Sequence, residues 1–479
     1  MITTSTLPAA FYRDAAPTPV TNPTFVLVNN TLAAQLGLGQ DFFEKSETLS
    51  ALSGNTSFEN QTPRALAYAG HQFGNWVPLL GDGRAHLIAT LKTPAGESKE
   101  LQLKGSGPSP FSRNGDGRAA LGPMLREYII SEAMAGLGIP TTRSLAVVTT
   151  GEQVYRRQRE PGAIVARIAK SHVRVGTFQF AASLRDIDNL RQLADHEIAR
   201  SYPDAPTGDD RYLWFLRSAI SRQAQLIARW MQVGFIHGVM NTDNMAISGE
   251  TIDYGPCAFM DTFHPKKTFS SIDSHGRYAW DQQSAIALWN LTRLAESLLP
   301  LFASEQEKAI ALATAELEAF NLQFETAFET GILHKMGITE RLDGDDVFIA
   351  STLTSLMQGE VDYTLFFSNL TRIAQGQDPH ALLALFNDQT LAKSWLVRWR
   401  ARLDGNAPDV SMMKFVNPVY IARNHQVEAA LQEAEQGNLA RAQSLCARLQ
   451  NPFVAKPSMA SFEAAPLPEE IVGATFCGT

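Results

Sequence analysis

Two short polar segments near the middle of the chain constrain its fold more than any other feature. Residues 237–244 read HGVMNTDN and residues 252–255 read IDYG. The apolar periodicity of residues 212–232 predicts a long amphipathic helix that leads directly into the first segment. The fold must therefore bring two polar loops together at the end of one long helix.

The residues between the two segments are typical of a very small hairpin, with arms at 245–247 and 251–252. Such a hairpin would hold Asn244 and Asp253, nine residues apart, close together at its base. Oxygen ligands are what Mg²⁺ prefers around phosphates. The pair therefore predicts a site for a metal and a phosphate group.

This order resembles the metal-handling segments of kinase-like phosphotransferases. Their catalytic loop carries an Asp that accepts the substrate proton, an Asn that binds metal and a second Asp downstream. In small-molecule kinases that first Asp follows His-Gly, where this chain has Val239, which neither accepts a proton nor binds a metal. Asp243, directly before Asn244, is the remaining candidate for a base. The loop has kept its metal ligands and has moved or lost its base.

The first part of the chain carries most of the strand signals. In order, we expect a hairpin, a glycine-rich loop, a helix and two short strands, at residues 85–104, 105–118, 121–137, 144–150 and 163–169. From about residue 185 the pattern is mainly helical, and the tail from Pro452 is predicted to be extended. We therefore predict an α+β, protein-kinase-like fold with two lobes. A small mixed N-lobe with a β-sheet would span residues 1–180, and a larger, mainly helical C-lobe would span residues 181–479.

Lys104 closes a predicted strand just before the glycine-rich loop. A lysine there reaches nucleotide phosphates when a helix carboxylate holds it in place, although a solvated strand-end lysine is the alternative. Glu127 and Glu132 both lie on the following helix, and spacing alone does not choose between them.

Further residues are candidates for binding an anionic ligand. Glycine turns let backbone N–H groups approach phosphates, and an arginine within an apolar strand must pair with an anion or lie on a polar face. These criteria select Gly81, Gly83, Arg84, Asp116, Gly117, Arg167 and Arg174.

Composition excludes several classes of protein. A net charge of −8 argues against a general binder of nucleic acid or anionic membranes, and no apolar run approaches the roughly 20 residues needed to cross a bilayer. The N-terminus lacks the pattern of a secretory signal, so we expect a cytoplasmic protein. Three cysteines are too few for a disulfide framework.

Several long motifs resemble the selenoprotein O (SelO, bacterial YdiU) family. They read GHQFG at 70–74, LLGDGR at 79–84, LQLKGSGPSPFSR at 101–113, GDGRA at 115–119 and HGVMNTDN at 237–244. The resemblance covers nearly the whole chain. It implies a protein-kinase-like fold that binds ATP in a flipped orientation and transfers AMP to hydroxyl side chains of proteins.

The resemblance also implies roles for individual residues. Lys104 would bind phosphate and pair with Glu127, Asp243 would accept the proton, and Asn244 and Asp253 would ligate magnesium. The nucleotide-binding residues would be Gly81, Gly83, Arg84, Asp116, Gly117, Arg167 and Arg174. Bacterial members resemble this chain in pairing a C-terminal cysteine with one in the activation-loop region, which implies a redox-sensitive disulfide between Cys257 and Cys477.

The leading functional hypothesis is a magnesium-dependent protein adenylyltransferase, with manganese as an alternative metal. It would transfer AMP from ATP to Ser, Thr or Tyr hydroxyls of partner proteins and release pyrophosphate. The alternatives are UMP transfer from UTP, a true phosphotransferase that uses Asp243 as a relocated base, and a non-catalytic ATP-binding scaffold.

Overall fold

The computed structural model describes residues 2–3, 7–156, 158–208 and 210–476. Its N-terminal region contains a β-sheet of eight strands in the order β2-β4-β7-β8-β10-β9-β3, with β1 paired to β7, and every pairing is antiparallel. The strands are β1 (Ile2–Thr3), β2 (Tyr12–Asp14), β3 (Thr24–Val28), β4 (Arg64–Leu66), β7 (Ala85–Lys92), β8 (Ser98–Lys104), β9 (Arg143–Tyr155) and β10 (Arg159–Ala169). Two small two-stranded sheets lie outside this sheet, the hairpin of β5 (Gly70–Gln72) with β6 (Asn75–Val77) and the pair of β11 (Phe235–Ile236) with β12 (Ala258–Phe259).

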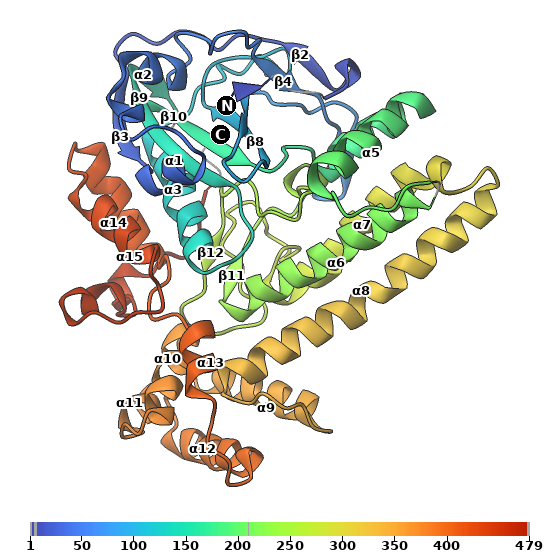
Figure 1. Ribbon diagram of the computed structural model, residues 1–479. Coiled ribbons are helices and arrows are strands. Elements are labelled where there is room, and N and C mark those ends of the chain that lie inside the picture. Colours follow the sequence, from blue (N-terminus) through green and yellow to red (C-terminus); the bar gives the residue numbers. More distant parts are fainter. Residues whose placement is uncertain (1, 4–6, 157, 209, 477–479) are drawn as a thin grey trace.

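The described residues after β10 are mainly helical (Figure 1). The α-helices of the described residues are α1 (Asn30–Gln35), α2 (Ser46–Leu52), α3 (Leu121–Gly136), α4 (Val175–Ser183), α5 (Ile187–Ser201), α6 (Arg211–Gln232), α7 (Gln283–Phe302), α8 (Gln306–Lys335), α9 (Asp345–Gln358), α10 (Tyr363–Ala374), α11 (His380–Leu383), α12 (Gln389–Leu403), α13 (Val410–Val416), α14 (Asn424–Glu435) and α15 (Ala440–Leu449). The predicted α+β composition, with a sheet first and helices after it, is confirmed.

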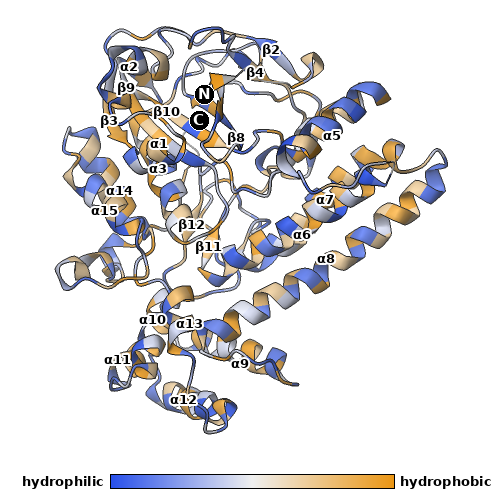
Figure 2. Ribbon diagram, viewed as in Figure 1, coloured by the Kyte–Doolittle hydropathy of each residue, from blue (hydrophilic) through white to orange (hydrophobic). Residues whose placement is uncertain are grey.

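Alternation along β8 explains how the sheet serves both a core and a cleft. Leu101 and Leu103 are buried in the apolar cluster beneath α1 and α2, and Gln102 and Lys104 necessarily project from the opposite face because side chains alternate along a strand. The region around β3 and β9 is largely hydrophobic, whereas α6 and α8 carry alternating hydrophilic and hydrophobic stretches (Figure 2). The pattern matches a sheet buried on both sides and helices buried on one.

Helix α3 covers the face of the sheet from which Lys104 projects. It packs against β9 and β10, and α14 and α15 pack against its other side (Figure 1). Most of its residues are buried, including Arg126, Glu127 and Glu132. Buried carboxylates need partners, so this helix is expected to carry ion pairs on more than one side.

Two local expectations were wrong. The expected arms at 245–247 and 251–252 do not form a β-ladder with each other. Ala246 instead forms a β-bridge with Arg174, and Thr251 forms one with Thr141. The segment lies between two longer pieces of backbone that supply its hydrogen bonds instead. The tail is also not extended throughout, since residues Pro457–Phe462 and Pro468–Glu470 form 3-10 helices that begin at proline.

Among the helices of the described residues, none combines the length and apolar character that crossing a bilayer requires.

Candidate active site

One cleft of about 1000 Å³ brings together residues from both halves of the chain. Its walls come from the 81–84 turn, the glycine-rich loop, β8, α3, the 239–244 loop and the 253–256 segment. Every candidate catalytic, nucleotide-binding, metal-binding and ion-pair residue lines it, namely Gly81, Gly83, Arg84, Lys104, Asp116, Gly117, Glu127, Arg167, Arg174, Asp243, Asn244 and Asp253. The candidate residues predicted from the sequence therefore line a single cleft.

Lys104 is held by two carboxylates. Its Nζ lies 2.6 Å from Glu127 Oε2 and 2.7 Å from Asp253 Oδ1. Glu132, the other candidate on α3, instead pairs with Arg143 through two hydrogen bonds of 2.6 and 2.8 Å. Residues five apart on a helix point about 140° away from each other, so only Glu127 faces the lysine.

Arg167 lies beside Lys104 because of the register between β8 and β10. The ladder places Arg167 directly opposite Gln102, which shares a face with Lys104. The guanidinium of Arg167 donates to Gln102 Oε1 at 2.5 Å, to Asp253 Oδ1 at 2.8 Å and to Glu127 Oε1 at 3.1 Å. This explains how an arginine that is 2% exposed is tolerated inside an apolar strand.

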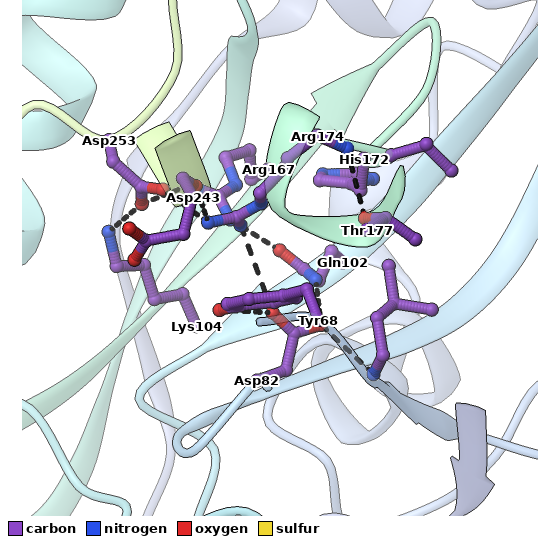
Figure 3. A network of polar contacts seen from close by, with 12 residues as sticks. Tyr68, Asp82, Gln102, Lys104, Arg167, His172, Arg174, Thr177, Asp243 and Asp253 are labelled. Carbon is purple, nitrogen blue, oxygen red and sulfur yellow. Dashed lines mark hydrogen bonds and ion pairs between the residues drawn. The ribbon is translucent and has the colours of Figure 1, made fainter. Parts of the chain in front are cut away.

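Arg174, directly before α4, connects the cleft wall to the 239–244 loop. It donates to Asp253 Oδ2 at 2.9 Å and to the backbone oxygen of Asp243 at 2.7 Å. Its guanidinium lies over the ring of Tyr68, 4.8 Å from the centroid, and 3.8 Å from Asp82 Oδ1. Figure 3 shows these side chains grouped around Lys104, Arg167 and Asp253.

Asp253 is the centre of this network. Burial alone would raise the pKa of its carboxyl, but Lys104, Arg167 and Arg174 outweigh burial and hold that pKa well below its usual range. Its backbone is left-handed, with a φ of 65°, which costs a non-glycine residue free energy and is found where surrounding contacts enforce it. The preceding carbonyl, of Ile252, accepts a hydrogen bond from His237 Nε2 at 2.9 Å.

Asp243 lies in the 3-10 turn Thr242–Asn244 and is 8% exposed. Burial raises the pKa of its carboxyl to about 6, although Arg174 opposes the shift. One oxygen, Oδ2, accepts a hydrogen bond from Gln72 Nε2 at 3.4 Å, and the other, Oδ1, is buried with no hydrogen-bond partner among the described residues. A carboxylate with a pKa near neutrality is suited to accept a proton.

The donor set fits a divalent cation that enters with a polyphosphate. Asn244 Nδ2 donates to Val239 O at 2.9 Å, so the side-chain oxygen is the atom of Asn244 that would face a metal. Asp253 contributes carboxylate oxygens, so Asn244 and Asp253 present the hard ligands that Mg²⁺ and Mn²⁺ accept. No cluster of three or more His, Cys, Asp or Glu side chains suited to a metal occurs in the described residues, and phosphate oxygens would have to complete the coordination.

The two glycine turns approach neighbouring chain so closely that side chains are excluded. Gly81 has a φ of 68°, and a Cβ there would lie 2.3 Å from Phe111 Cγ. Gly117 has a φ of 64°, and a Cβ there would lie 2.1 Å from the carbonyl carbon of Gly107. Both turns line the cleft with backbone, as expected for a surface that contacts an anion.

Asp116 is held at the outer part of the cleft. It accepts hydrogen bonds of 2.9 and 3.0 Å from Arg156, and this bidentate contact lowers the pKa of Asp116. Its side chain is 51% exposed, unlike the buried acids deeper in the cleft.

The sequence did not single out four residues of this network. Gln102 is two residues before Lys104, a period-two signal that could have identified it. Tyr68, Asp82 and Gln72 had no such signal, although Asp82 is between the candidate glycines and Gln72 is within the GHQFG motif. Asp82 is 3% exposed and accepts from Gln102 at 2.8 Å and from Tyr68 at 3.3 Å.

Cys257 is buried two residues after the 252–255 segment, and Arg126 donates to its carbonyl at 2.6 Å. The C-terminal tail reaches the same place, because Thr475 Oγ1 donates to Pro256 O at 2.6 Å and Thr475 bridges Ser270. Cys477 lies outside the described residues, so its bond to Cys257 stays a prediction.

The comparisons with known proteins agree with one another. The sequence model of the family described as "Protein adenylyltransferase SelO" matches residues 2–450. Relatives named "Protein nucleotidyltransferase YdiU" include a Bradyrhizobium sp. protein, 50% identical over 478 residues, and a Methylorubrum populi protein, 50% identical over 485 residues. A third, from Rhodopseudomonas palustris, is 49% identical over 478 residues. Each alignment covers 99% of this chain and 97% of the relative.

Proposed function

The chain belongs to the protein adenylyltransferase SelO family, and on that premise we propose that it transfers AMP from ATP to Ser, Thr or Tyr hydroxyls of proteins. We propose further that it does so on a protein-kinase-like scaffold, with the sheet-containing lobe at 1–180 and the helical lobe at 181–479. One observation carries the proposal. A buried carboxylate, Asp243, lies in a cleft with three buried cations, while the usual position of a kinase base is occupied by Val239.

The proposed step is a displacement at the α-phosphorus of ATP. The acceptor hydroxyl gives its proton to Asp243, its oxygen bonds to the α-phosphorus, and the bond from that phosphorus to the β-phosphate oxygen breaks. Pyrophosphate leaves with the electron pair. Asp243 suits this role because it is buried with a pKa of about 6.

The basic side chains act on the leaving group. Lys104, Arg167 and Arg174 are fixed by carboxylates before any nucleotide binds. Such preorganised charges stabilise the negative charge that develops on pyrophosphate without reorganising during the step.

Asn244 and Asp253 would hold a divalent metal, which when bound offsets phosphate charge. The charge balance of the site supports this assignment. Glu127 and Asp253 already neutralise most of the charge of the three cations. A nucleotide triphosphate would therefore bring more negative charge than these side chains can offset, and a cation that enters with it restores the balance.

The test is to supply acceptor protein and ATP labelled at either the α- or the γ-phosphate. We expect label in protein only from the α-position, with no transfer by Asp243→Asn, which keeps the size of the side chain. Label that enters protein only from the γ-position would show a phosphotransferase instead.

UMP transfer from UTP is a second candidate, because the relatives carry the broader name of nucleotidyltransferase. Competition of labelled ATP with unlabelled UTP, in magnesium and in manganese, separates the two. If unlabelled UTP suppresses AMP transfer at equal concentration, and α-labelled UTP supplied alone labels the protein, the nucleotide assignment changes while the site assignment stays.

Redox control is a further part of the proposal. Thr475, two residues before Cys477, is hydrogen-bonded to the residue before Cys257, which supports a disulfide between the tail and the metal-binding segment. A peptide map of oxidised protein without reductant should contain the linked pair. Only separate Cys257 and Cys477 peptides would contradict it.

A further inference from the structure

The hairpin formed by β5 and β6 docks on the catalytic loop residue by residue. His71 N donates to Thr242 Oγ1 at 2.7 Å, and Phe73 N donates to Asn241 Oδ1 at 2.9 Å. Between them, Gln72 reaches Asp243. Three neighbouring residues of the hairpin therefore contact three neighbouring residues of the loop, 241–243.

The same hairpin surrounds both oxygens of the Asp243 carboxylate. Gln72 Nε2 donates to Oδ2 at 3.4 Å. A Cβ built on Gly70 would lie 3.3 Å from Oδ1 and 2.9 Å from Thr242 Oγ1, so a side chain at this position would crowd both oxygens. Oδ1 is buried and has no hydrogen-bond partner among the described residues.

Among the described residues, Gln72 is the side chain that donates a hydrogen bond to the Asp243 carboxylate. The backbone of the loop has supports outside the hairpin, since Arg174 donates to Asp243 O at 2.7 Å and Asn290 donates to Met240 O at 3.0 Å. The orientation of the carboxylate therefore depends on its contacts with the hairpin.

The hairpin itself is braced from behind. His71 Nδ1 is 2.9 Å from Gln179 Nε2 of α4, and the His71 ring contacts Trp76 and Trp289, each at a centroid distance of 5.1 Å. These contacts give Gln72 a rigid base from which to hold Asp243, as a supporting residue of a catalytic group requires.

We propose that Gln72 is a positioning residue for the reaction, and that its amide orients the Asp243 carboxylate toward the acceptor hydroxyl. This inference rests on the proposed role of Asp243 as proton acceptor. Gln72 touches neither of the proposed metal ligands by any hydrogen bond of the described residues. Gln72 also lines the cleft, but because it bonds neither metal ligand, its loss should slow the transfer step much more than it weakens the binding of nucleotide.

The test compares Gln72→Met, which keeps the length of the side chain and removes the donor, with wild type. We expect kcat for label transfer to fall by about 10- to 100-fold, the usual effect of losing the support of a reacting group. KM for ATP and the calorimetric Kd for Mg–ATP should stay within twofold. Gln72→Glu, which replaces the donor by a second carboxylate, should lose at least as much.

Asn75→Ala is the matched control, because Asn75 pairs with Gln72 across the hairpin, is exposed and does not contact Asp243. It should keep wild-type kcat. If Gln72→Met keeps kcat within twofold of wild type, or if its Kd for Mg–ATP weakens as much as kcat falls, the positioning role is wrong.

The two proposals fail differently. Label transferred only from the γ-position would overturn AMP transfer but leave Gln72 testable, since Asp243 would accept the proton in either reaction. Normal AMP transfer by Gln72→Met would overturn only the role of Gln72.

Discussion

Removing the charge of Asp253 should destabilise the nucleotide-free protein, because three buried cations depend on it. Asp253→Asn keeps the shape of the side chain and removes the carboxylate. In wild type that carboxylate contacts Lys104 at 2.7 Å, Arg167 at 2.8 Å and Arg174 at 2.9 Å.

The magnitude follows from the partners that remain. Breaking a buried ion pair by removing one partner costs about 3–5 kcal/mol. Glu127 still pairs with Lys104 and Arg167 in the variant, so we expect the lower end, about 3 kcal/mol. An unfolding entropy of about 2.1 cal/mol/K per residue corresponds to about 1 kcal/mol/K for this chain, and the melting temperature should fall by about 3 °C.

Scanning calorimetry at pH 7 with a metal chelator measures this difference. Asp116→Asn is the matched control, because Asp116 forms an equally well-aligned pair with Arg156 but is 51% exposed. An exposed pair contributes about 0–1 kcal/mol, so this control should melt within about 1 °C of wild type.

The effect should also depend on pH. The pKa of Asp253 is depressed in the folded protein. The contribution of its carboxylate to the free energy of unfolding is therefore complete above the unfolded-state pKa, near 3.8, and is lost as the pH falls through the pKa of the folded protein. The gap between variant and wild type should be constant above about pH 5 and shrink below about pH 4. If Asp253→Asn melts at or above the temperature of wild type, or no lower than Asp116→Asn, the account of the ion-pair network is refuted.

Three further predictions test other parts of the structure. Glu127→Gln should reduce transfer of the α-label by at least about tenfold, whereas Glu132→Gln should leave the rate unchanged and lower the melting temperature; equal rates would show that the choice between the two glutamates is wrong. Burial lowers the pKa of Lys335 from 10.5 to about 7, and the Phe367 ring, with its centroid 4.4 Å from Nζ, offsets part of the cost of the buried charge. Lys335→Met should therefore stabilise the protein by up to a few kcal/mol at and below pH 7, with the gain vanishing above about pH 10.5; urea unfolding at pH 7 and pH 10.5 checks the size and the sign. Gly81→Ala should weaken the calorimetric affinity for Mg–ATP by at least about tenfold, because a Cβ would collide with Phe111 at a φ of 68°; unchanged affinity would exclude the Gly81 turn from the nucleotide site.

Local pattern was enough to predict the main elements near the site. Alternation and glycine turns predicted the hairpin at 85–104, observed as Ala85–Lys92 and Ser98–Lys104, and 3.6-residue periodicity predicted the helix observed as Leu121–Gly136. Both signals are carried by neighbouring residues, so the sequence contains them without reference to the rest of the fold. The prediction of a small hairpin at 245–252 was wrong because the backbone partners of this segment, Thr141 and Arg174, are distant in sequence.

The sequence by itself determined which chemical groups the site contains, because a lysine at a strand end, an arginine within an apolar strand and an Asn–Asp pair each stand out by residue type and neighbours. Only the tertiary structure decided their relations. The register of β8 against β10 placed Arg167 opposite Gln102. The rotation of α3 about its axis decided that Glu127 faces Lys104. The docking of a hairpin that is distant in sequence brought Gln72 into contact with Asp243. The physical reason is that pairing register, helix rotation and docking depend on long-range packing, whereas the chemistry of a side chain is local.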